Sequence, residues 1–163
     1  MNSQFFNDLH FILFMQNSEK HCRSVKPKLQ ICKHYIISFI YIINMVYSVE
    51  ATVYEPMYEY NEKKYMKITV PNKVRDYILG LHLNRSNTIL FPDKLDDPLE
   101  GNVLKVKVPF RYRRVMCNVD GDTPVQSLVK GDQVQTEIQF NGVWNAHEHS
   151  GYSWVLKYIK YKN

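Results

Sequence analysis

Cysteine and glycine are both scarce in this sequence of 163 residues. Its three cysteines (Cys22, Cys32 and Cys117) are odd in number and widely spaced, which excludes a zinc knuckle and a disulfide framework. Reduced thiols in a cytosolic or nuclear compartment are the simplest account. The six glycines form no phosphate-binding loop, and neither a Gly-x-Ser-x-Gly motif nor an oriented Cys–His pair occurs. Nothing in the sequence names a reaction, so we expect no catalysis and no cofactor.

Long apolar runs are lacking as well. The uncharged run from Tyr35 to Val49 has about 15 residues, whereas a helix needs roughly 20 apolar residues to cross a bilayer. Ser38, Asn44 and Ser48 interrupt this run. A membrane partner is therefore not expected.

Residues 1–44 differ in composition from the rest of the chain. They contain no glycine, and five basic against two acidic residues give them a net charge of +3. Three interpretations are open: a membrane anchor or late signal peptide, a helix packed on the domain, and upstream sequence before a natural start at Met45. We favour the third, because A/T-rich codons encode such residues and a regular alternating pattern begins directly after Met45. The chain then divides into a dispensable leader, residues 1–44, and a domain, residues 45–163.

From Met45 onward, apolar and polar residues alternate in one segment after another. A period of two is typical of strands that bury one face. It predicts main strands over 47–53, 66–70, 104–112, 134–140 and 152–158. Glu55-Pro56 marks an end or bulge, and the polar residues 61–64 form the turn of a first hairpin. Asn141-Gly142 is expected to be a turn or bulge, and residues 145–151 a polar loop.

A different spacing predicts one helix, from Lys73 to about Leu83. Its apolar stripe consists of residues three and four apart, Val74, Tyr77, Ile78 and Leu81, and Asn72 is the expected N-cap. We expect a brief strand over 86–91, an acidic loop over 92–100 and one helical turn over 123–128. Five main strands with one inserted helix are typical of a small closed barrel. The sequence thus predicts a mainly β fold, a small five-stranded barrel with one inserted helix, plus a non-barrel N-terminal segment.

The segment from Leu104 to Arg114 is the most informative. Its even positions are apolar through Tyr112, while four cations and no acid occupy odd positions, Lys105, Lys107, Arg111 and Arg113. On a strand these cations share the face opposite the core. Charge of one sign on such a face favours an anionic partner, nucleic acid before membrane. The open alternative is an edge strand whose charges discourage aggregation.

The sequence from Leu128 onward resembles a known pattern. Leu128-Val129-Lys130-Gly131-Asp132-Gln133-Val134 precedes a strand, after which come Trp144, a polar loop, Gly151-Tyr152 and a closing strand. Over about residues 103–161 this order resembles the OB-fold single-stranded DNA-binding proteins, in their bacterial or their large-DNA-virus and phage versions. The resemblance implies an OB-like barrel whose cationic strand lines a DNA channel. The helix and acidic loop between Pro71 and Glu100 depart from the bacterial pattern.

We therefore expect single-stranded DNA binding with little sequence preference, in support of replication, repair or recombination. Such binding needs cations along the backbone path and aromatic faces for the bases. The expected cations are Lys105, Lys107, Arg111, Arg113, Arg114 and Lys130, and the expected aromatics are Trp144, Tyr152, Trp154, Tyr58 and Tyr60. We expect Trp144 to be exposed because it borders the polar loop, and Trp154 to be buried because it alternates in phase with Leu156.

Alternatives stay open. One alternative is that the β-domain is a non-enzymatic protein-interaction or virion structural module, which the apolar N-terminal segment anchors. Another is that it is an RNA-binding barrel. A homo-oligomer is compatible with each of these functions. A cytoplasmic or nuclear site of DNA replication is the favoured location. His147 and His149 have no third ligand in reach, so an exposed polar loop is expected there rather than a zinc site.

Overall fold

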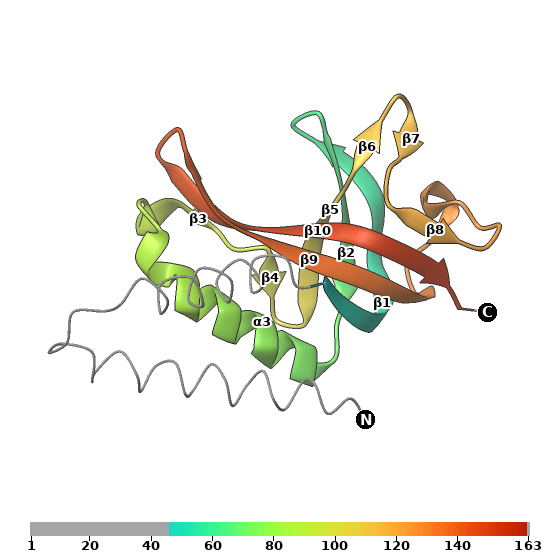
Figure 1. The fold of residues 1–163 in the computed structure, drawn as a ribbon, viewed down its shortest axis with the longest axis horizontal. Helices are drawn as coiled ribbons and strands as arrows, with labels where there is room; N and C mark the ends of the chain where they lie inside the picture. The colour runs from blue at the N-terminus through green and yellow to red at the C-terminus, as the bar shows by residue number, and fades with distance from the viewer. Residues whose placement is uncertain (1–45, 163) are drawn as a thin grey trace, which may run out of the picture. The chain divides into compact units, whose positions relative to one another are not determined.

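The chain forms a mainly β structure with one inserted α-helix (Figure 1). The computed structural model describes residues 46–162, and the predicted leader, residues 1–44, lies outside the described residues. The strands are β1 (Val46–Tyr60), β2 (Lys63–Thr69), β3 (Leu95–Asp96), β4 (Leu99–Glu100), β5 (Val103–Val108), β6 (Phe110–Arg111), β7 (Arg114–Val115), β8 (Asn118–Asp120), β9 (Gln133–Ala146) and β10 (His149–Tyr161). The helix is α3 (Asn72–Arg85), and three 3₁₀ turns are η1 (Ser86–Thr88), η2 (Pro92–Lys94) and η3 (Val125–Ser127).

Five of these strands close into a ring. β1 pairs antiparallel with both β2 and β9, β2 pairs antiparallel with β5, and β9 pairs antiparallel with β10. The ring closes where Val155 of β10 pairs in parallel with Lys107 of β5. The predicted mainly β fold, a small five-stranded barrel with one inserted helix, is thereby confirmed.

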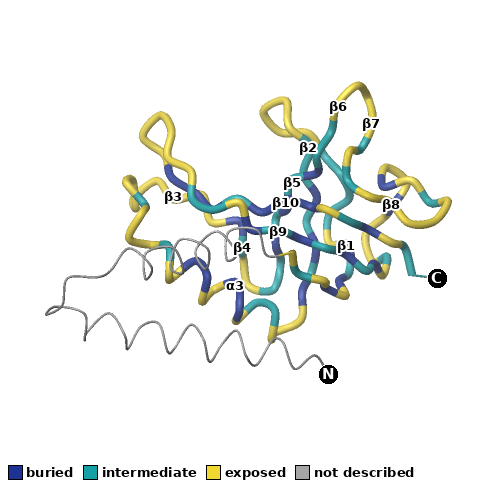
Figure 2. Tube along the Cα trace, in the orientation of Figure 1, coloured by how far each residue is buried: buried dark blue, intermediate teal, exposed yellow. Residues whose placement is uncertain are grey.

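The core of the barrel follows from the alternation along each strand. Inward positions are buried on every strand of the ring, including Val49, Val53, Met66, Ile68, Leu104, Val106, Val134, Ile138, Trp154 and Leu156. Figure 2 shows buried residues along the middle of the strands and exposed residues at the hairpin tips. One polar side chain in this core, Thr136, donates its hydroxyl hydrogen to the Val49 carbonyl oxygen at 3.2 Å. Its burial therefore leaves no unsatisfied polar group.

The helix α3 packs its predicted apolar stripe against the barrel. Tyr77, Ile78 and Leu81 are buried, and His82 is buried beside them. The predicted N-cap is wrong by one residue: Pro71 precedes the helix, and Asn72 is its first residue. The Asn72 side chain instead accepts a hydrogen bond from Nδ2 of Asn102 at 2.6 Å.

The predicted strand over 86–91 is wrong. Ser86 and Thr88 turn their hydroxyls back onto the carbonyl oxygens of Leu83 and Arg85, at 2.8 and 2.7 Å. Such local hydrogen bonds favour continued turns over an extended strand. The chain therefore runs from α3 directly into η1. The expected acidic loop over 92–100 contains η2 and the short strands β3 and β4, and the expected turn over 123–128 is η3.

A bulge in β9 sets the direction of Trp144. Phe140 pairs with Trp154 and Gly142 pairs with Ser153, so Asn141 is the extra residue. Gly142 has φ of 100°, which glycine adopts without strain. The extra residue reverses the alternation beyond it. Trp144 consequently faces outward, although its even position is in phase with buried Phe140.

Two other expectations about β9 and β10 are wrong. The expected polar loop over 145–151 is a two-residue turn, His147-Glu148, between paired strands. Tyr158 does not share the inward face of Trp154 and Leu156, because a second register shift lies between Leu156 and Tyr158. Tyr158 instead donates a hydrogen bond to Oδ2 of Asp120 at 2.8 Å, on the outside of the barrel.

The segment from Leu104 to Arg114 is not one strand. β5 ends at Val108, because Pro109 has no N–H to continue the ladder. β6 and β7 then form a hairpin whose turn residues, Tyr112 and Arg113, have φ of 50° and 61°. Tyr112, predicted to be on the apolar face, is 89% exposed. The prediction of four cations on one strand face is therefore wrong: Lys105 and Lys107 share that face, and the arginines project from the hairpin.

Candidate nucleic-acid interface

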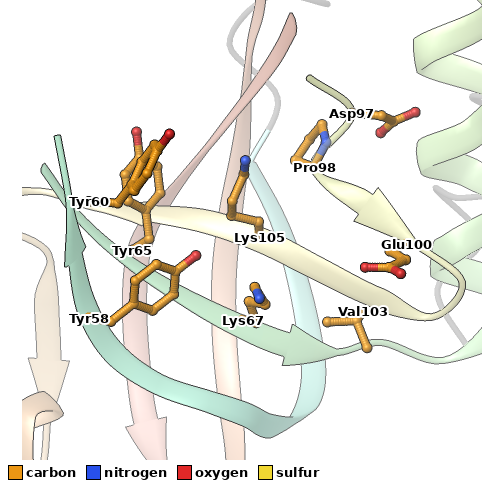
Figure 3. A pocket seen from close by; sticks show the side chains of 9 residues that line it. All are labelled: Tyr58, Tyr60, Tyr65, Lys67, Asp97, Pro98, Glu100, Val103 and Lys105. Atoms are coloured by element: carbon orange, nitrogen blue, oxygen red, sulfur yellow. The ribbon is translucent and has the colours of Figure 1, made fainter. Parts of the chain in front are cut away.

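The outer faces of β1, β2 and β5, together with residues 97–100 before and in β4, form a groove of about 310 Å³. We call it the tyrosine groove; its lining is Tyr58, Tyr60, Tyr65, Lys67, Asp97, Pro98, Glu100, Val103 and Lys105 (Figure 3). Tyr65 and Lys67 point outward because they alternate with buried Met66 and Ile68. Register then aligns Tyr58 with Tyr65 and Lys67 with Lys105 across neighbouring strands.

Three tyrosines supply the aromatic surface of this groove. The Tyr58 and Tyr65 ring centroids are 6.0 Å apart, and Tyr60 is 63% exposed. Burial raises the pKa of the Tyr58 and Tyr65 phenols above its ordinary value, so both stay neutral. The structure brings the predicted Tyr58 and Tyr60 together with Tyr65. Tyr65 is not among the residues predicted from the sequence, although its alternation with Met66 in the predicted hairpin indicates that its side chain points outward.

The lysines of the tyrosine groove are engaged by acids. Lys105 forms an ion pair of 2.7 Å with Asp96, and Lys67 forms one of 2.7 Å with Glu55. Their ammonium groups also lie over aromatic rings, Lys105 at 5.9 Å from the Tyr65 centroid and Lys67 at 5.7 Å from that of Tyr58. The groove itself consequently has little excess positive charge.

Unpaired cations gather instead at one end of the barrel. Among residues 46–162, no ion pair involves Lys107, Arg111, Arg113 or Arg114. We call residues 110–115 the arginine hairpin; all three of its arginines are exposed and it contains no acid. The pairing of Lys64 with Val108 puts the β1–β2 turn and the arginine hairpin at the same end, where Figure 1 shows them side by side.

Trp144 lies on the same outer surface as the tyrosine groove. It pairs with Gly151 of β10, and Gly151 pairs with Asp96 of β3. Asp96 in turn forms the ion pair with Lys105 in the groove. Trp144 is 36% exposed and Trp154 only 2%. The prediction that Trp144 is exposed and Trp154 is buried is therefore confirmed.

Tyr152 and Trp154 belong to the core, and their predicted role as nucleic-acid contacts is wrong. The Tyr152 hydroxyl donates to the His82 carbonyl oxygen at 2.9 Å, and Nε1 of Trp154 donates to Nε2 of His82 at 3.0 Å. The His82 and Tyr152 rings stack with centroids 3.9 Å apart. Both aromatic side chains therefore hold α3 against β10 and present no face to a ligand.

The same histidine reaches the edge of the tyrosine groove. Nε2 of His82 accepts a hydrogen bond from Trp154, so the imidazole proton of His82 resides on Nδ1. This Nδ1 lies 3.3 Å from Oδ1 of Asp97. Burial raises the pKa of Asp97, but His82 and the Leu99 N–H together lower it further, so the net pKa lies below the ordinary value. Asp97 is thus held ionised where the helix meets the groove.

The remaining predicted residues lie elsewhere. Nζ of Lys130 is 4.8 Å from the centroid of the Tyr54 ring, and neither residue lines the tyrosine groove.

His147 and His149 are exposed at the β9–β10 turn. Within residues 46–162, no group of three His, Cys, Asp or Glu side chains is arranged to hold a metal ion. Burial raises the pKa of the free Cys117 thiol to about 11.

Comparison with protein-family models, with curated proteins and with solved structures finds no match for this chain. In the described part of the chain, no helix has both the length and the apolar character that a bilayer crossing requires. Function is therefore inferred from the geometry of the described residues.

Proposed function

We propose that this protein binds single-stranded nucleic acid, DNA in the first place, without catalysing a reaction. Bases stack on the tyrosine groove and on Trp144, and the phosphate backbone runs along Lys107 and the arginine hairpin. The observation that carries the proposal is that the tyrosine groove, with its exposed Tyr60, begins at the end of the barrel where the β1–β2 turn lies beside the unpaired cations of the arginine hairpin (Figure 1).

The aromatic rings and the unpaired cations of this surface make separate contributions to the binding free energy. Stacking of a base on an aromatic ring contributes on the order of 1–3 kcal/mol with little sequence preference. Phosphates that contact arginine or lysine release counterions, which makes the affinity fall as salt rises. Unpaired cations serve this second role better than Lys67 and Lys105, which would first have to leave Glu55 and Asp96.

Duplex DNA fits this surface less well. The rings of the tyrosine groove lie on the curved outer face of the barrel, and paired bases cannot turn their flat faces toward them. The resemblance to single-stranded DNA-binding proteins, including those of large DNA viruses and phages, favours a role in replication, repair or recombination. RNA meets the same chemical requirements and is the competitor to test.

The testing experiment titrates the full chain with fluorescently labelled oligo-dT and with duplex DNA at two salt concentrations. We expect oligo-dT to bind more tightly than the duplex and to lose affinity steeply at the higher salt concentration. Unlabelled oligo-U as competitor ranks RNA against DNA. Absence of oligo-dT binding at low salt would contradict the proposal.

One observation favours a second function, protein binding. Leu83 at the end of α3 is 75% exposed and Leu90 beyond η1 is 67% exposed, and exposed apolar side chains that gather in one region mark protein contacts. If the oligo-dT titration shows no salt-dependent binding, a protein-interaction or virion structural module becomes the better account. Replacement of both leucines by serine would then abolish partner binding.

A further inference from the structure

Tyr112 lies at the tip of the arginine hairpin, where it contributes little packing to the fold. It is 89% exposed, and the next most exposed tyrosine, Tyr60, is 63% exposed. Among residues 46–162, the Tyr112 ring makes no contact with another ring and no cation–π contact. Both faces of this ring are therefore available to a ligand.

The backbone of this turn is poorly suited to a tyrosine. Tyr112 and Arg113 have φ of 50° and 61°, in the left-handed region that a two-residue hairpin turn of this kind requires. The first residues of the β1–β2 and β9–β10 turns, Asn61 and His147, have φ of 50° and 49°. Asparagine and histidine are enriched in this region, whereas bulky residues are rare there. The demands of the turn thus explain Asn61 and His147 but do not explain Tyr112.

The charges around Tyr112 are suited to an anionic ligand. Arg111, Arg113 and Arg114 flank it, and the arginine hairpin contains no acid. Among residues 46–162, none of these arginines forms an ion pair. A single strand offers phosphates to cations and flat faces of unpaired bases to an aromatic ring. The tip of the hairpin presents both of the groups that such a strand needs.

The hairpin lies at the end of the barrel where the tyrosine groove begins. Tyr60, the most exposed ring of the groove, pairs with Lys63 next to the β1–β2 turn, and Figure 1 shows this turn beside the hairpin. The base of the hairpin is held on β2, because Nζ of Lys64 lies 5.5 Å from the centroid of the Phe110 ring. A strand that leaves the groove at Tyr60 therefore meets the hairpin next.

We propose that Tyr112 is a further stacking position for single-stranded nucleic acid, where its ring stacks on an unpaired base while the flanking arginines contact the adjacent phosphates. This inference rests on the proposed single-strand binding and extends the stacking surface from the groove onto the arginine hairpin. The hairpin then holds the strand by stacking as well as by charge.

The test replaces Tyr112 by asparagine in the full chain. Asparagine tolerates the left-handed backbone, so Tyr112→Asn should raise the melting temperature by about 2–5 °C. The same change removes the ring, so the affinity for oligo-dT of about 20 nucleotides should fall about 5- to 100-fold. The salt slope should stay nearly unchanged, because no cation is lost. Stability and binding should thus change in opposite directions, which a structural role of the ring would not produce.

His147→Asn is the matched control. It makes the same substitution at the same position of another two-residue turn, outside the tyrosine groove and the arginine hairpin, and should leave the affinity unchanged. Tyr112→Phe keeps the aromatic face and should retain most of the affinity. Thermal melts and oligo-dT titrations of all three variants, at several salt concentrations, supply the comparison.

The outcomes separate this inference from the proposed function. If the parent and Tyr112→Asn bind oligo-dT equally, stacking on Tyr112 is overturned and single-strand binding stands. A lower melting temperature together with a lower affinity would show that the ring supports the fold, and would also overturn the inference. An equal loss of affinity in Tyr112→Phe would assign the contact to the hydroxyl group instead of the ring. If the parent binds no oligo-dT, the proposed function and the inference fail together.

Discussion

The indole ring of Trp144 lies over the α-carbon of Gly151 on the neighbouring strand. A Cβ atom added at Gly151 would stand 2.6 Å from Cζ2 and 2.7 Å from Nε1 of this ring, well inside van der Waals contact. The glycine thus allows one face of the indole to rest on the backbone, and Trp144 stays 36% exposed. The ring is held in place without being buried, which is what a stacking platform requires.

Gly151→Ala tests this contact. We expect it to lower the free energy of unfolding by about 1–3 kcal/mol, because the added methyl group displaces a ring that packs against backbone. In a Trp144→Ala background the same change should cost much less. Urea unfolding of the parent, both single variants and the double variant measures the coupling. Additive effects would show that the two residues do not interact.

Trp144→Ala should also weaken oligo-dT binding by roughly 1–3 kcal/mol. The dependence of affinity on salt should stay nearly unchanged, because stacking releases no counterions. Trp144→Phe retains an aromatic face and should recover part of the loss. Titration at several salt concentrations separates the two quantities, and a changed salt slope in Trp144→Ala would argue against a stacking role.

Asp97 links stability to pH. Its pKa is lower in the folded protein than its ordinary value, so the ionised form is favoured by folding. The stabilisation is present above the ordinary carboxyl pKa of about 4 and is lost as the pH falls through the folded value. We expect Asp97→Asn to melt at a lower temperature than the parent at neutral pH, with the gap closing under acidic conditions. A gap that is constant across the acid range would contradict this.

The exposed histidines should contribute little to nucleic-acid binding and to stability. Replacing His147 and His149 by alanine is expected to leave oligo-dT affinity and melting temperature nearly unchanged, because both lie exposed on the β9–β10 turn, outside the tyrosine groove. Fluorescence titration and thermal melts check the two quantities. Metal analysis of the purified parent is the control, and stoichiometric zinc that disappears in the double variant would reopen a metal site.

Much of the fold is predictable from the sequence because strand and helix patterns are local. Alternation correctly placed the strands that contain Val49, Met66 and Ile138, and apolar spacing placed α3 with an error of one residue at its start. Proline at position 109 was the visible signal that the cationic segment would break. Because Arg111 and Arg113 continue the alternation beyond the proline, the pattern alone predicts a strand that runs across it.

The candidate site was less predictable, because it depends on relations between elements. A single extra residue at Asn141 decides that Trp144 faces outward, and a sequence pattern does not show on which side of a bulge the alternation resumes. The charge state of the surface depends on pairs such as Lys105 with Asp96, which sit on different strands. Only the folded barrel shows that these lysines are engaged while the arginines are not.

The arginine hairpin provides the sharpest test of the proposed backbone path. Arg111→Ala combined with Arg113→Ala should lower oligo-dT affinity and flatten the salt slope by about two phosphate contacts. The melting temperature should stay nearly intact, because both side chains are exposed and form no ion pair among residues 46–162, and exposed charges contribute little to stability.

Lys157→Ala is the matched control for this pair. Lys157 is also an exposed cation, but it lies at the bulge of β10, outside the tyrosine groove and the arginine hairpin. Its removal should lower the affinity only slightly and leave the salt slope unchanged, because no backbone phosphate is expected to contact it. If the double-arginine variant binds oligo-dT like the parent at low salt, the hairpin does not contact the strand. Its charges then serve only to discourage aggregation, and protein binding becomes the better account of this domain.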